Sequence, residues 1–155
     1  MSDEQWLSHE QLAAWRKMIA VVERLPNILE TQLQRDSAMS HFEYFTLAML
    51  SEAKDRKLRI TELALKTNAT VARLSHVLSR LEKRGLVRRE PCPHDGRATN
   101  AALTAAGWDA VVAAAPHHVH TVRDTVMRPL TKADVADLDR IMGAILSRMD
   151  GGGRT

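Results

Sequence analysis

Apolar residues recur at helical spacing near both ends of the chain. They are separated by three, four or seven residues between about residues 9 and 35, and by three or four residues between 135 and 149. The positions are Leu12, Trp15, Ile19, Val22, Leu29 and Leu33 in the first stretch, and Val135, Leu138, Met142, Ile145 and Met149 in the second. Such spacing places apolar side chains on one side of a helix, so each stretch predicts an amphipathic helix. Pro26 predicts a bend in the first helix.

Helix-capping residues divide the middle of the chain into shorter elements. Ser, Thr and Asn residues followed by apolar periodic runs indicate where helices begin, and Gly or Asn indicates where they end. The predicted order is a helix from the Ser40 capping box to about Ser51, a short strand at 58–60, a helix at 62–66 capped by Thr61, a turn at 67–69, and a helix from the Thr70 cap to about Arg84, ended by Gly85.

A β-hairpin and a long helix are predicted after Gly85. Residues 86–90 and 100–103 have the composition of strands, and residues 91–98 between them are rich in turn-forming types. Thr104 then caps a helix from Ala105 to about Arg128, which Pro116 should kink or divide. Thr131 caps the last helix, and the glycines at 151–153 should end the ordered chain. The expected fold is mainly α with a small β-hairpin, in a single domain over 1–155.

Composition agrees with a folded helical protein. Of the 155 residues, 45% are hydrophobic and only 4% aromatic, so the core must consist mainly of aliphatic side chains. No stretch approaches the roughly 20 apolar residues that span a bilayer, and the polar residues 1–11 do not resemble a secretory signal. The single cysteine, Cys92, fits a reducing compartment. These features predict a cytoplasmic protein.

Positive charge is concentrated in the middle of the chain. Residues 54–97 hold twelve basic and five acidic residues, a net charge of +7. The flanking residues hold ten basic and fourteen acidic residues, a net charge of −4. A basic segment between acidic flanks indicates that one part of the fold contacts a polyanion.

The predicted helix after Thr70 has the pattern of a helix that reads DNA. Leu74, Val77, Leu78 and Leu81 form its apolar side, and the opposite side has small, polar and basic residues with no carboxylate before Glu82. The major groove admits an α-helix and presents hydrogen-bond acceptors to it, while the helix N-terminus attracts phosphate. The candidate DNA-binding residues, of which the longer ones could reach base edges or phosphates, are Thr70, Val71, Ala72, Arg73, Ser75, His76, Ser79, Arg80 and Lys83. An ordinary solvated helix is the alternative.

The tip of the predicted hairpin carries Asp95, Gly96 and Arg97. An arginine at the end of a hairpin can enter the minor groove beside the major groove that the helix occupies. We therefore expect Arg97 to contact DNA and the Asp95 carboxylate to hold the Arg97 guanidinium. An exposed turn arginine in an incidental ion pair is the alternative.

The ordered motifs resemble the MarR family of bacterial regulators. The resemblance rests on I-T-E-L-A at 60–64, the helix at 74–80, L-E-K-R-G-L-V-R-R at 81–89, D-G-R at 95–97 and L-T-x-x-G at 103–107. It covers nearly the whole chain in one order. Asn68 stands where the turn of this family often has Gly, and His76 where many members have Arg, so base preference cannot be carried over.

The resemblance implies a winged helix-turn-helix fold with N- and C-terminal dimerisation helices. The DNA-binding lobe would span about 54–103, with the recognition helix at Val71–Lys83 and the wing at Arg88–Leu103; dimerisation helices would span about 9–35 and 105–149. It further implies a homodimeric transcriptional regulator, more often a repressor, that binds a palindromic operator on double-stranded DNA. A small aromatic or anionic effector would relieve DNA binding.

Several residues outside the DNA-binding candidates have alternative roles. His117, His120 and Asp124 share one helix side and could bind a metal, with His41 nearby. Alternatively, one of His117, His118 and His120 could line a small-molecule pocket, with Arg123 pairing an anionic ligand. Solvated or hydrogen-bonded histidines are the simpler interpretation, so no cofactor is expected.

Three further alternatives concern residues outside these histidines. Cys92 could be a redox switch in the wing. Trp6 and Trp15 are interpreted as core or dimer contacts rather than a ligand-stacking site. No nucleophile elbow, phosphate loop or dinucleotide motif is present, so no enzyme is predicted; a winged-helix protein-interaction module is the competing class.

Overall fold

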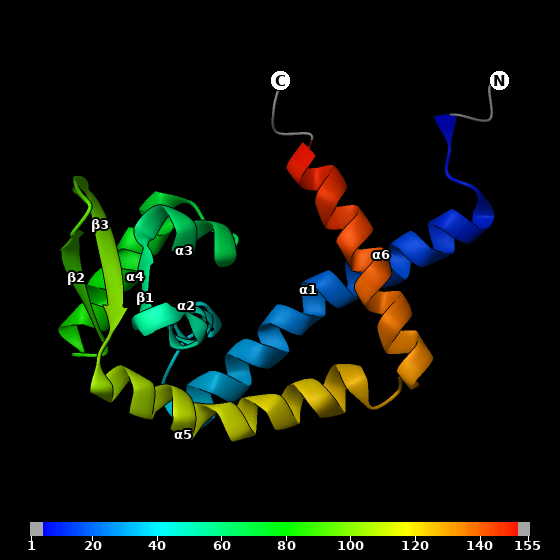
Figure 1. Ribbon diagram of the computed structural model, residues 1–155. Helices are drawn as coiled ribbons and strands as arrows, with labels where there is room; N and C mark the ends of the chain where they lie inside the picture. Colours follow the sequence, from blue (N-terminus) through cyan, green and yellow to red (C-terminus); the bar gives the residue numbers. More distant parts are fainter. Residues whose placement is uncertain (1–4, 152–155) are drawn as a thin grey trace. The chain divides into compact units, whose positions relative to one another are not determined.

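The computed structural model describes residues 5–151 and confirms a mainly helical fold with a small antiparallel sheet (Figure 1). Its elements are α1 (His9–Ser37), α2 (His41–Glu52), a 3-10 turn (Lys54–Arg56), β1 (Lys57–Arg59), α3 (Ile60–Lys66), α4 (Val71–Lys83), β2 (Val87–Cys92), β3 (Asp95–Leu103), α5 (Ala105–Val122), a π-helical turn (Arg123–Met127) and α6 (Lys132–Gly151). Contacts divide the chain into two compact units, with the boundary between His118 and Val119. Among the described residues no helix is long and apolar enough to cross a membrane.

Local capping signals set most helix starts. Ser40 accepts a hydrogen bond from the Glu43 N–H while the Glu43 side chain accepts from the Ser40 N–H, which is the predicted capping box. Thr70 caps α4 by accepting from the Arg73 N–H at 3.1 Å. The predicted caps at Thr104 and Thr131 are also formed, on the N–H groups of Gly107 and Asp134.

The prediction that Thr61 caps the third helix is wrong. This helix, α3, begins at Ile60, and its cap residue Arg59 makes no side-chain cap bond. The physical reason is that Lys57–Arg59 pairs with β3 as β1, so the chain passes from strand to helix without a loop and Thr61 already lies in the first turn. The predicted strand at 58–60 is correspondingly shifted by one residue.

The two strands of the hairpin are longer than predicted. Positions 91–92 and 95–98, expected in the connecting loop, belong to β2 and β3. The sheet order is β1-β3-β2, so β2 is an edge strand, where Pro91 costs no ladder hydrogen bond on its outer side. A register shift between Pro91 and Cys92 accommodates the irregular sequence there.

Proline does not divide the fifth helix. Of the two predicted effects of Pro116, a kink or a division, the division is wrong, because α5 continues from Ala105 to Val122. Val111 and Ala114 are buried in the preceding turns and hold this part of the helix in the core, which offsets the one missing hydrogen bond. The irregularity comes later, at the π-helical turn Arg123–Met127. At the end of the chain, Gly151 still belongs to α6, and Gly152 and Gly153 lie outside the described residues.

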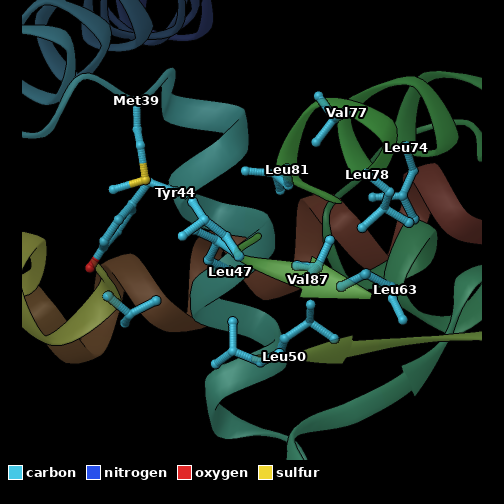
Figure 2. Close-up of a cluster of buried hydrophobic side chains, with 14 of the residues drawn as sticks. Met39, Tyr44, Leu47, Leu50, Leu63, Leu74, Val77, Leu78, Leu81 and Val87 are labelled. Carbon is cyan, nitrogen blue, oxygen red and sulfur yellow. The ribbon is translucent and has the colours of Figure 1, made fainter. Parts of the chain in front are cut away.

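One hydrophobic core holds the first unit together (Figure 2). Leu47 and Leu50 of α2, Leu63 of α3 and Leu74 and Leu78 of α4 are fully buried in it. Two left-handed residues close the turns around α4, Asn68 before it and Gly85 after it, as the sequence predicts. Gly107 packs against the Leu86 carbonyl so closely that any Cβ would clash with it. This fixes the start of α5 against the chain between α4 and β2.

Candidate nucleic-acid interface

The two sides of α4 have opposite chemistry. Leu74, Val77, Leu78 and Leu81 are at most 3% exposed and anchor the helix in the core. The sequence-predicted DNA-binding positions of α4 all lie on its remaining surface: Val71, Ala72, Arg73, His76, Arg80 and Lys83 are exposed, and Ser75 and Ser79 are half-buried. Its outward side therefore presents small and basic residues without a carboxylate.

Glu82, the one acidic residue of α4, is occupied by the wing. Its carboxylate accepts hydrogen bonds from the Arg89 backbone N–H at 2.7 Å and from the Arg89 guanidinium at 3.1 Å. These hydrogen bonds, the backbone one first, lower the pKa of Glu82 below its ordinary value. The negative charge of this helix is thus neutralised locally by β2.

Most basic residues of the central segment fall into two groups, which the charge count alone does not separate. The first group is used inside the protein: Arg84 pairs with Glu43, Arg89 with Glu82, and Lys57 and Arg88 with Glu90. Arg56 lies over the Trp108 ring at 3.7 Å. All of these contacts except Arg88–Glu90, which lies within β2, join neighbouring elements, and each gives its basic side chain a partner inside the protein.

The second group has no partner among residues 5–151. Its members, which form no ion pair or side-chain hydrogen bond there, are Lys54, Lys66, Arg80, Lys83 and Arg97. Arg80 and Lys83 project from α4 and Arg97 from the tip of the hairpin. Arg73 is a special case, because its guanidinium also lacks a hydrogen-bond partner in this part of the chain but lies 4.1 Å from the centroid of the Phe42 ring.

The hairpin tip is organised differently from the prediction. Asp95 does not hold the Arg97 guanidinium; its carboxylate accepts from the Arg97 backbone N–H at 3.1 Å. An aspartate carboxylate that accepts from the backbone N–H two residues later closes a local turn. In this turn the Asp95 carboxylate faces the backbone rather than the Arg97 side chain. Arg97 therefore points into solvent, exposed and unpaired among the described residues.

The candidate ligand histidines do not form one cluster. His118 of α5 lies against the Tyr44 ring at 4.5 Å, with its Nδ1 3.2 Å from the Gln32 Oε1, and His41 lies 6.1 Å away, ring centre to ring centre. Burial lowers the pKa of both His41 and His118. Both rings therefore favour the neutral form. Neither Gln32 nor Tyr44 was predicted in this group, although Gln32 lies beside the apolar stripe of α1.

The second unit holds the other histidine pair. His120 Nε2 lies 3.1 Å from an Asp124 carboxylate oxygen, and Arg128 contributes a second ion pair to Asp124 at 3.5 Å. Arg123 is exposed beside them, and His117 is exposed at the end of the first unit. Nowhere in residues 5–151 do three His, Cys, Asp or Glu side chains gather as a metal site. The metal hypothesis for His117, His120 and Asp124 thus has no support in the fold.

Cys92 is the only cysteine and is buried at the end of β2. The backbone N–H groups of His94 and Asp95 lower the pKa of its thiol, and Arg59 acts in the same direction. The structure places the thiol in the wing, as the sequence suggested. Its proposed redox role stays a prediction.

Comparison with known proteins places this site in a family. The profile of the MarR family matches residues 39–98, which run from α2 to the hairpin. Among solved structures, Sco3205 of Streptomyces coelicolor, a MarR family transcriptional regulator in complex with DNA, is 42% identical, with 93% of this chain and 94% of that chain covered and a TM-score of 0.90. AbsC, a MarR family regulator of the same organism, is 35% identical, with 95% and 99% covered and a TM-score of 0.90.

The fold extends to more distant structures. A mutant form of MarR of E. coli, complexed with operator DNA, is 21% identical over 92% of this chain and 99% of that chain, with a TM-score of 0.76, and shares the fold. No curated protein matches the sequence. The fold and the outward side of α4 define a winged helix-turn-helix regulator. The chain belongs to the MarR family of transcriptional regulators.

Proposed function

We propose that this protein is a sequence-specific regulator that binds double-stranded DNA with α4 in the major groove and the β2–β3 hairpin on the adjacent minor groove. The observation that carries the proposal is the carboxylate-free outward side of α4, on which Arg80 and Lys83 have no partner among the described residues. The DNA complexes of Sco3205 and of E. coli MarR support it by analogy.

The chemistry of α4 fits a groove rather than open solvent. Ala72, Ser75 and Ser79 are small and allow the helix backbone to come close to base edges. His76 can donate or accept a hydrogen bond there, and the Thr70 cap leaves the first turn of α4 next to a phosphate. Arg97 at the hairpin tip supplies a cation for the neighbouring minor groove. Together these groups make phosphate contacts for affinity and base contacts for specificity.

We further propose that the working form is a homodimer. The apolar stripes of α1 and α6 support this, because Trp15, Val22, Met142 and Met149 are exposed in the single chain. A two-fold assembly would pair two copies of α4 with the two halves of a palindromic operator. Repression, relief by a small aromatic or anionic effector, and action in the bacterial cytoplasm are proposed from the family alone.

Selection of DNA from a random pool, followed by sequencing, tests the function. Wild-type protein should enrich one palindromic sequence, and the variant carrying both Arg80→Ala and Lys83→Ala should lose this enrichment at the same salt concentration. Arg148→Ala is a matched control, because it removes an exposed cation from α6 instead. Failure of folded wild-type protein to enrich any DNA would favour a protein-interaction module.

A further inference from the structure

The Arg73 guanidinium is held by its face and left free at its edges. Its central carbon lies 4.1 Å from the centroid of the Phe42 ring, in the first turn of α2. Phe42 is half-buried and packs against the hydrophobic core, so the ring itself is fixed. Resting on the proposed DNA-binding function, we infer that Phe42 is a positioning residue that presents Arg73 to a backbone phosphate at the edge of the major groove.

Stacking and hydrogen bonding use different parts of a guanidinium. The aromatic ring attracts the flat face of the cation, while the five N–H donors point outward in the guanidinium plane. Within residues 5–151 the Arg73 side chain has no ion pair or hydrogen bond, and the residue is exposed. The stack therefore restricts the rotation of a long side chain without using any of its donors.

Nearby carboxylates form no ion pair with Arg73 in the described part of the chain. Glu23 and Glu30 line the same surface hollow as Arg73, Phe42 and His41. Glu30 is occupied, because it accepts from the His41 N–H at 2.7 Å and from the Gln34 side chain at 3.1 Å. Neither carboxylate forms an ion pair with Arg73 in the described structure. The N–H donors of Arg73 therefore remain available for an anion from outside the protein.

The position of Arg73 on the helix favours phosphate over a base edge. Successive helical residues are about 100° apart, so Arg73 lies about a quarter turn from the buried side that Leu74 occupies. Ala72, His76 and Lys83 instead lie opposite the buried side, where a helix faces the groove floor. The Phe42 contact draws Arg73 toward α2, and phosphates line the groove edges. The residue pattern alone left both a base edge and a phosphate open as targets for Arg73, and the stack on Phe42 favours the phosphate.

Binding of operator and random DNA by Phe42→Leu, Arg73→Ala and the double variant tests the inference over a salt titration. Arg73→Ala should weaken binding to both DNAs by about tenfold. It should also reduce the slope of log affinity against log salt concentration by about one, because one phosphate contact is lost. Phe42→Leu keeps an apolar side chain but removes the ring, so it should weaken binding to operator and random DNA by about threefold. In the Arg73→Ala background, Phe42→Leu should have no further effect.

Two controls separate positioning from folding. Phe45→Leu removes another aromatic ring of α2, which stacks on His41 rather than Arg73, and should leave DNA affinity unchanged. Phe42→Tyr retains the ring face and should restore wild-type binding. An equal loss from Phe42→Leu with and without Arg73 would overturn the inference, as would a change in base preference without loss on random DNA. If wild-type protein binds no DNA, the proposed function itself fails, which is a different result.

Discussion

The helices α4 and α6 have similar apolar patterns but opposite surroundings. Both repeat apolar residues at intervals of three and four. In α4 this stripe is buried by the chain's own α2, α3 and sheet, whereas α6 has no buried residue and its Met149 is 68% exposed. The periodicity thus specifies which side of a helix is apolar, but not which molecule covers it. An exposed stripe of this length indicates a partner, and the proposed second copy supplies one.

Truncation of a leucine in α4 should have the largest effect. Leu78 is fully buried, so Leu78→Ala leaves a cavity and should lower the free energy of unfolding by about 3 kcal/mol. Denaturant unfolding measures this change. Met149→Ala in α6 is the comparison; measured at a protein concentration too low for the proposed dimer to form, it should cost less than about 0.5 kcal/mol. Equal losses at the two positions would remove the contrast between the helices.

A charge on the α6 stripe should act on assembly rather than on folding. Ile145→Asp would bury an unpaired carboxylate in the proposed dimer interface, so the dimer should dissociate at protein concentrations about a hundredfold higher than for wild type. Ser147→Asp, on the side of the helix opposite the stripe, should leave the dimer intact. Light scattering across a concentration series measures both. A monomeric wild-type protein, or equal dissociation of the two variants, would contradict the homodimer proposal.

Removal of the wing cation should have a smaller effect, on DNA binding alone. Arg97→Ala should weaken operator binding by about tenfold and reduce its salt slope by about one. Arg88→Ala is the matched change, because Arg88 already pairs with Glu90 and should contribute little. Fluorescence anisotropy in a salt series measures both. An unchanged slope for Arg97→Ala would mean that the hairpin tip does not contact DNA.

The smallest expected effect is that of mild acid on the stability of the fold, through the half-buried His118. Burial lowers the pKa of His118 below 6.5, so the unfolded chain takes up a proton first as the pH falls. The contribution of His118 to stability is therefore fully present above about pH 6.5 and decreases below it, until the folded-state pKa is passed. His118→Gln should flatten the pH dependence of thermal unfolding between about pH 5 and 7, and a pH dependence equal to that of wild type would contradict this account.

Features encoded by neighbouring residues could be predicted from the sequence. The Ser40 capping box, the caps at Thr70, Thr104 and Thr131, and the left-handed Asn68 each depend on residues within one turn. The failed cap at Thr61 depends instead on the pairing of β1 with β3, about forty residues later. The residues around Thr61 do not indicate this pairing, so the predicted start of α3 was two residues too late.

The candidate site shows the same division. The outward residues of α4 follow from its periodicity, so their exposure was predictable. Which basic side chains already form ion pairs could not be predicted, because their partners Glu43, Glu82 and Glu90 lie in other elements of the fold. The group of His41, His118, Gln32 and Tyr44 was missed for the same reason, since it joins three helices.

The contact at Gly107 has a mechanical consequence. Thr104 donates its hydroxyl to the Gly85 carbonyl at 2.6 Å and its N–H to the Leu86 carbonyl at 3.1 Å, next to the place where Gly107 meets Leu86. These contacts hold the base of α5 against the residues that follow α4. A displacement of the base of α5 would therefore be expected to move α4 with it. In the proposed operator-bound dimer, a hinge that changes the distance between the two half-sites would then lie farther along the chain than this joint.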